Sequence, residues 1–206
     1  MTNKERYSYF CAQTPDLPIF MQNWWMDAVC AGKQWDVLLY DNAEEQICAV
    51  MPYLLRHRAW MHYILMPQMT QIGGIWMNED VKNDPKKVAE ICEYFARQID
   101  EMNLSYYYQH YPIHSTAIEA MCAQGFKTKE RITYRIEDLS DLDKVINAFS
   151  KNKKRQLQKA LSLHVDMNMT VEDFYRFHTQ CLQNQDKHIS YTREFLLVLE
   201  RKAHRL

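Results

Sequence analysis

One helix and the segments on either side of it constrain the fold of this chain most strongly. Asp84 followed by Pro85 is a strong helix start, because aspartate caps the first amides and proline suits the first helical position. Apolar side chains then recur three or four residues apart, forming one stripe that must be buried: Val88, Ile91, Cys92, Phe95, Ile99 and Met102. Strand-like segments precede and follow this helix, which predicts an α/β domain with helices packed on a sheet.

The strand-like segments are short and rich in apolar, β-branched and aromatic residues. Those before the helix cover residues 35–40, 46–56, 60–65 and 75–77, with Pro52 marking a bulge or an edge. An aromatic strand at 104–111 follows, and residues 126–136 also have an extended pattern. Further helices are predicted at 18–30, ending near Gly32, and at 115–123, ending near Gly125.

The last third of the chain differs in character. Ser140 with Asp143 predicts a capped helix to residue 149, and Thr170 and Thr192 predict the starts of two later helices. Between them, apolar residues alternate with polar ones and predict a half-buried strand: Leu163, Val165, Met167 and Met169. A lone strand needs backbone partners, so either it joins the sheet of the first domain or its partners lie beyond this chain. We favour the second alternative and expect residues 1–139 to form one domain and residues 140–206 to open a second, incomplete one.

A basic helix is predicted at residues 150–161, capped by Ser150. It concentrates five cations in a chain of net charge −1: Lys151, Lys153, Lys154, Arg155 and Lys159. Such a face suits a phosphate-bearing ligand. It equally suits a face that is merely solvated.

Composition excludes several classes of protein. The balance of 25 basic and 26 acidic residues argues against a general binder of nucleic acid or membrane surfaces. No signal-peptide core and no membrane-span length of apolar residues occur, and the six cysteines are scattered singly. We therefore expect a cytoplasmic protein with reduced thiols, no membrane span and no metal site.

Three runs carry a resemblance to a known family. Residues 117–127 (AIEAMCAQGFK), followed by Tyr134, resemble the C-terminal half of the GNAT acyltransferase fold, in which a helix closes on Gly-Phe-Lys. Residues 20–25 (FMQNWW) resemble the opening helix of Fem-type transferases, and residues 149–160 (FSKNKKRQLQKA) resemble the basic helix that begins their second GNAT domain.

The resemblance implies a GNAT-like, mostly antiparallel mixed sheet flanked by helices, followed by the helical start of a second such domain. It implies part of an N-acyltransferase that moves an acyl or aminoacyl group to an amine, with the chain as given inactive alone. Acyl-CoA or aminoacyl-tRNA is the expected donor, and a phosphorylated, nucleotide-linked or cell-envelope precursor the expected acceptor. Transfer RNA remains a further candidate partner, and a homo-oligomer is compatible. The alternative is a GNAT-derived interaction module without catalysis.

One departure from the family concerns coenzyme A. GNAT domains hold its pyrophosphate on a glycine-rich loop before the long helix, where backbone amides approach the phosphate closely. The corresponding residues 78–84 (NEDVKND) contain no glycine and three carboxylates, which repel a pyrophosphate. We therefore expect no cofactor bound to residues 1–139.

Candidate site residues lie in three places. Tyr106, Tyr108 and His110 share one face of their strand and are acid–base candidates, although such aromatics more often pack in a core. The remaining candidates are expected to bind substrate: Trp24, Gln68, Thr70, Gly73 and Gly74 around a cleft, and Lys153, Lys154 and Arg155 on the basic helix. A plain loop explains residues 68–74 equally well.

Overall fold

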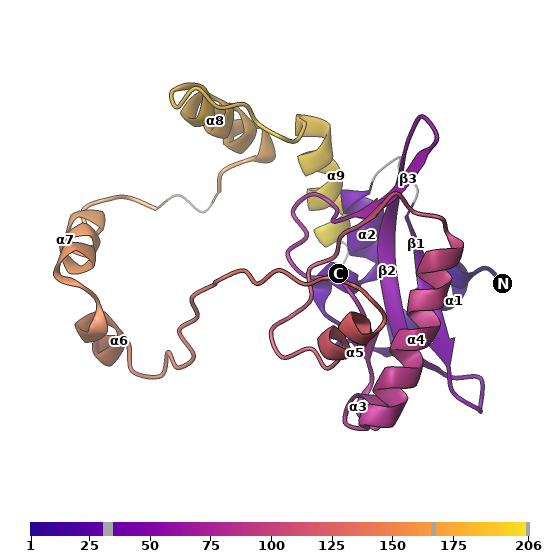
Figure 1. Cartoon of the computed structure of the whole chain (residues 1–206). Coiled ribbons are helices and arrows are strands. Elements are labelled where there is room, and N and C mark those ends of the chain that lie inside the picture. Colours follow the sequence, from indigo (N-terminus) through magenta and orange to yellow (C-terminus); the bar gives the residue numbers. More distant parts are fainter. Residues whose placement is uncertain (31–34, 166–167, 205–206) are drawn as a thin grey trace.

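A five-stranded sheet with helices on both faces forms the body of the protein (Figure 1). The computed structural model describes residues 1–30, 35–165 and 168–204. The strands are β1 (Trp35–Asp41), β2 (Ile47–Arg58), β3 (Met61–Leu65), β4 (Trp76–Met77) and β5 (Tyr106–Tyr107). Their order is β1-β2-β3-β5, with β4 paired to β2; all pairs are antiparallel except β3 with β5. The predicted mixed, mostly antiparallel α/β class is therefore confirmed.

The strand beside β2 is interrupted. β3 pairs with the second half of β2 and β4 with its first half, and both lie on the edge of β2 opposite β1. Ten residues, 66–75, separate Leu65 from Trp76, whereas only three separate their β2 partners Leu54 and Val50. Residues 66–75, which we call the detour, must therefore leave the sheet and return to it. The detour holds four of the residues predicted to bind substrate.

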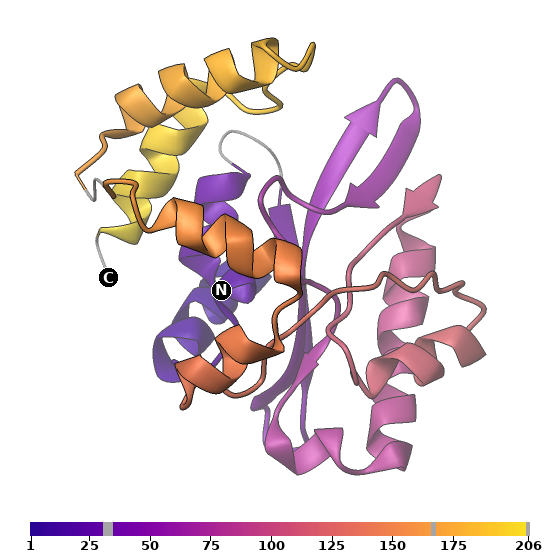
Figure 2. The ribbon, with the colours of Figure 1, turned by 90° about the vertical axis from the view of Figure 1, so that its left-hand side faces the viewer.

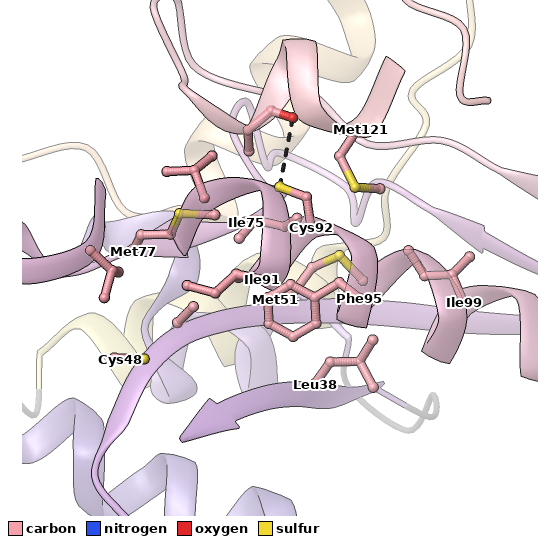
Figure 3. Packing of buried hydrophobic residues seen from close by; sticks show 14 of the residues in the cluster. Leu38, Cys48, Met51, Ile75, Met77, Ile91, Cys92, Phe95, Ile99 and Met121 are labelled. Carbon is pink, nitrogen blue, oxygen red and sulfur yellow. Dashed lines mark hydrogen bonds between the residues drawn. The ribbon is translucent and has the colours of Figure 1, made fainter. Parts of the chain in front are cut away.

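One face of the sheet is covered by α4 (Pro85–Glu101) and α5 (Ala117–Ala123). Phe95, Cys92 and Ile91 of α4 are fully buried against Met51 of β2 and Ile64 of β3 (Figure 3). The Cys92 thiol also lies 3.9 Å from the carbonyl oxygen of Ala117, so α5 packs directly on α4. The apolar stripe predicted for α4 is thus confirmed.

The opposite face carries the N-terminal helices α1 (Asn3–Gln13), η1 (Ile19–Met21) and α2 (Asn23–Val29), as Figure 2 shows. Tyr7 of α1 is fully buried and donates its hydroxyl hydrogen bond to the carbonyl of Met21. α1 was not predicted from the sequence, although Thr2 and Glu5 form a complete capping box at its start. The helix predicted at 18–30 is broken at Gln22, whose extended backbone separates η1 from α2. Gly32, predicted to lie near its end, falls outside the described residues.

Four further helices are described after α5: α6 (Leu142–Ala148), α7 (Lys151–Ala160), α8 (Val171–Gln183) and α9 (Arg193–Ala203). α6 and α7 stand away from the sheet, whereas α9 returns to pack on α2 (Figure 1). Ser150, Thr170 and Thr192 cap their helices as predicted, but α6 is capped by Asp141 rather than Ser140.

Two predicted strands are not formed among the described residues. The half-buried strand at 163–169 is wrong, since residues 163–165 and 168–169 pair with no strand and Leu163 and Val165 are about 70% exposed. Met167 of that prediction lies outside the described part. Residues 126–136 likewise form no strand, and Tyr134 is 96% exposed. An alternating pattern becomes a strand only where a neighbouring edge accepts its hydrogen bonds.

Candidate functional site

The outward face of β5 and its continuation brings the predicted acid–base candidates together. Tyr106 and Tyr108 stack with ring centroids 6.2 Å apart, and His110 meets Tyr108 edge-on at 5.0 Å. Tyr106 is more than half exposed, while Tyr108 and His110 are half-buried. The strand of paired backbone is only two residues long, but the alternation predicted for residues 106–111 is confirmed by these contacts.

Tyr108 and His110 belong to one hydrogen-bonded chain. Arg131 donates from its guanidinium to the Tyr108 hydroxyl oxygen at 2.7 Å, and that hydroxyl lies 2.9 Å from His110 Nε2. His110 Nδ1 lies 3.1 Å from the carbonyl oxygen of Gln71, which can only accept. In a neutral imidazole Nδ1 must therefore carry the proton, and Nε2 accepts from the Tyr108 hydroxyl. The geometry therefore directs His110 Nε2 at the Tyr108 hydroxyl.

The inward face of the same segment is part of the core. Tyr107 and Tyr111 join their hydroxyls at 3.1 Å, and Tyr107 also donates to the sulfur of Met51 at 3.5 Å. Burial raises the pKa of both hydroxyls well above the usual value for tyrosine. These two tyrosines stay neutral and anchor the segment that carries Tyr108 and His110.

The detour is held by hydrogen bonds to α2 and to the segment just before α9. Trp25 Nε1 of α2 donates to the buried hydroxyl of Thr70 at 3.0 Å, and Gln68 Nε2 donates to the Ser190 carbonyl at 2.7 Å. Trp24 is half-buried and lies edge-on to Trp25, with centroids 5.7 Å apart. Thr70 therefore has a packing role, whereas the Gln68 side chain lies at the surface.

The two glycines of the detour allow it to lie close against the segment after β5. Gly73 donates its amide hydrogen bond to the His110 carbonyl at 2.7 Å, and Gly74 donates to Gln109 Oε1 at 3.4 Å. Gly74 has φ of +79°, and a Cβ there would lie 2.8 Å from the Tyr111 ring. Both glycines are buried, so their amides serve this contact. Beside them, Gln109 Nε2 is buried with no hydrogen-bond partner among the residues that the structure describes.

The loop before α4 does not fit a coenzyme A pyrophosphate. Residues 79–82 form the short helix α3, in which Lys82 pairs with Glu79. Asp84 then places its own carboxylate on the first amides of α4, 2.9 Å from Lys86 N and 3.4 Å from Lys87 N. In other proteins the first amides of a helix can bind a phosphate, but in α4 these amides already donate to the Asp84 side chain.

The three residues of the basic helix α7 that were predicted to contact phosphate differ in their partners. Lys154 Nζ donates to the Asn147 carbonyl at 2.9 Å and so ties α7 to α6, and Arg155 donates to Asn152 Oδ1 of its own helix. Lys153 is exposed and has no side-chain partner within the described ranges. α7 lies well apart from the sheet (Figure 1), so the structure does not bring these cations to Tyr108.

Two residues of this site were not predicted from the sequence. Arg131 and Gln71 complete the chain on either side of Tyr108 and His110, yet they lie 23 and 39 positions from those partners. No local pattern marks them, because they become neighbours only when the detour and residue 131 reach the end of β5.

Among the described residues, no group of three or more metal-ligating side chains is present. No helix in the described part of the chain is long and apolar enough to cross a bilayer.

Comparisons with known proteins give structural neighbours only. No family model matches the chain, and no curated protein matches it in sequence. A mutant form of the BH1408 protein from Bacillus halodurans is 12% identical with a TM-score of 0.36, covering 65% of this chain and 87% of its own. A ribosomal-protein-alanine N-acetyltransferase from Brucella melitensis biovar Abortus is 11% identical with a TM-score of 0.38, covering 66% and 93%. The aminoglycoside 6'-N-acetyltransferase AAC(6')-Ih from Acinetobacter baumannii is 13% identical with a TM-score of 0.37, covering 66% and 95%. Similarity at this level identifies neither a substrate nor a reaction for this chain.

Proposed function

We propose that this protein is an N-acyltransferase, or the part of one that handles the amine acceptor. The observation that carries the proposal is the chain from Arg131 through Tyr108 to His110, held at the end of β5. Such an enzyme must remove a proton from the amine nitrogen as the nitrogen bonds to an acyl carbon. A tyrosine directed at a histidine base suits that step.

The proposed proton path uses only these side chains. As the new C–N bond forms, the Tyr108 oxygen takes the amine proton while its own proton moves to His110 Nε2. Arg131 stabilises the negative charge that develops on the Tyr108 oxygen during this exchange. The Gln71 carbonyl accepts from His110 Nδ1 and so stabilises the imidazolium that results. The bond between the acyl carbon and the donor sulfur or oxygen then breaks, and the imidazolium returns its proton, through Tyr108, to that leaving atom.

The residues next to the hydrogen-bonded group of Arg131, Tyr108 and His110 are proposed to contact the substrate. The acceptor would lie against the exposed side of the detour, where Gln68 is accessible and Trp24 is half-buried. Thr70, Gly73 and Gly74 are proposed to support this surface by packing, because their polar atoms already form hydrogen bonds within the protein. On α7, Lys154 and Arg155 already have intramolecular partners, which leaves Lys153 as the candidate for a phosphate contact. Because α7 lies apart from the sheet in this structure, that contact is not part of the site around Tyr108 (Figure 1). The donor, acyl-CoA or aminoacyl-tRNA, would bind away from the start of α4.

A second candidate function is a binding module without catalysis. The Asp84 carboxylate on the α4 amides favours it, because a domain that no longer binds a cofactor pyrophosphate can fill those amides with its own anion. This candidate predicts a folded protein that transfers no acyl group.

Acyl transfer to a panel of amines, from acyl-CoA and aminoacyl-tRNA donors, tests the proposal on the protein as its gene encodes it. We expect Tyr108→Phe to lower the rate by about a hundredfold or more, the usual size of a lost acid–base group. Tyr106 lies on the same face as Tyr108 but forms no hydrogen bond to His110, so Tyr106→Phe should leave the rate unchanged. Transfer unaffected by Tyr108→Phe contradicts the proton path, and no transfer from any donor favours the binding module.

A further inference from the structure

The hairpin between β2 and β3 projects beyond the rest of the sheet. Among the described residues, β1 pairs with β2 only as far as Leu54, and residues 55–58 pair with β3. Both views show this hairpin standing clear of the helices (Figures 1 and 2). Ala59 at the turn has φ of +53°, and the backbone then presents Trp60 outward with 86% of its surface exposed. A tryptophan so exposed at the outermost turn of a hairpin is not explained by packing.

Two arginines lie behind this apex, and no carboxylate of the hairpin opposes them. Arg58 lies opposite Met61, and Arg56 lies opposite Tyr63, on one face of the hairpin. His57 and His62 lie together on the other face, with ring centroids 4.5 Å apart. The sequence contains no aspartate or glutamate between Gln46 and Asn78. Neither arginine forms an ion pair with any residue in the described ranges.

The order of these side chains along the hairpin matches the order of layers at a bilayer surface. Trp60 and the part-exposed Met61 form the apolar apex, and Arg58 and then Arg56 follow behind it. The two arginines are two residues apart on one strand, about 7 Å at the usual rise. A headgroup region is roughly 5–7 Å thick on each side of the hydrocarbon core. Tryptophan prefers the boundary between these layers, and guanidinium groups prefer anionic headgroups.

We propose that the β2–β3 hairpin is a docking point for an anionic lipid surface, with Trp60 inserted at the headgroup boundary and Arg56 and Arg58 on lipid phosphates. The near-neutral charge of the whole chain does not bear on this, because the cations are local and uncompensated within the hairpin. Docking here does not depend on the proposed acyl transfer. The hairpin tip is a surface element, so its variants should keep the fold.

The test is co-sedimentation of the full chain with phosphatidylcholine vesicles, with and without phosphatidylglycerol, at low salt. We expect binding only to the anionic vesicles. Arg56→Glu with Arg58→Glu should lower the partition coefficient by at least about tenfold, since each basic residue near an anionic surface contributes measurably to binding. Trp60→Ala should also weaken binding, and brominated lipids should quench wild-type fluorescence more than that of Trp60→Phe.

Matched controls distinguish the hairpin from general charge and exposure. Lys129→Glu with Arg135→Glu makes the same change in net charge on another exposed segment, and Tyr134→Ala removes an aromatic ring that is 96% exposed there. Both controls should bind like the wild type. Absence of binding to anionic vesicles, equal losses in the controls, or tighter binding of single-stranded RNA through the same residues would overturn the proposal.

Discussion

At the scale of single residues, the site depends on partners that are remote in the sequence. The alternation of Tyr106, Tyr108 and His110 on one face could be predicted, because side chains of an extended segment alternate strictly. Arg131 and Gln71 could not, since only the tertiary fold carries them to the end of β5. The sequence therefore predicted the two central members of the chain and missed the two that orient them.

Cys92 provides a residue-scale prediction about pH. Burial raises the pKa of its thiol to about 11 in the folded protein, from an ordinary value of 9.0. Because the folded-state pKa is the higher one, the contribution of Cys92 to stability is complete below pH 9 and is lost as the pH rises toward 11. Urea midpoints measured across this range should fall less for Cys92→Ala than for the wild type. Equal slopes for both proteins would show that Cys92 does not drive the change.

At the scale of elements, helices with local signals were predicted well and strands less so. α4 follows from its cap, its proline and its stripe, all within one segment. β5 shrinks to two paired residues, and residues 126–136 form no strand, because strand formation requires a partner edge that the segment itself does not encode. The detour between β3 and β4 could not be predicted for the same reason: its length matters only relative to the three β2 residues that it bypasses.

The cap of α4 gives a prediction at this scale. Asp84→Ala removes the acceptor for the amides of Lys86 and Lys87, so we expect a loss of about 1 kcal/mol in the free energy of unfolding. Asp80→Ala removes an equally charged, exposed side chain of α3 that accepts no capping hydrogen bond, and should change stability by only a few tenths of that value. Chemical denaturation of both variants measures the difference. A larger loss for Asp80→Ala would contradict the assigned cap.

At the scale of the whole molecule, the chain divides its burial unevenly. Two cores on opposite faces of the sheet contain nearly all of the fully buried residues, and both are built from residues before 125. Beyond that point, Leu196 of α9 is the only described residue that reaches the buried class, at 8% exposure. The predicted division near residue 139 remains a prediction.

Limited proteolysis examines this division directly. Residues 127–139 are exposed, form no helix or strand, and contain four trypsin sites: Lys127, Lys129, Arg131 and Arg135. Exposed segments without secondary structure are cut first, so we expect the earliest trypsin cuts at these four sites. Lys86 and Lys87 are also exposed but lie in the first turn of α4, and they should be cut later. Early cutting within α4 would contradict this order.

The carboxylate at the start of α4 also determines what any anion from solution must overcome there. Asp84 is joined to the helix that it caps, so its effective concentration at those amides is set by the chain and not by the cell. A free phosphate would have to displace the Asp84 carboxylate, which cannot diffuse away because it belongs to the same helix. The displaced carboxylate would stay nearby and repel the negatively charged phosphate. A free anion would therefore bind the first turn of α4 only at a concentration comparable with the effective concentration of the Asp84 carboxylate.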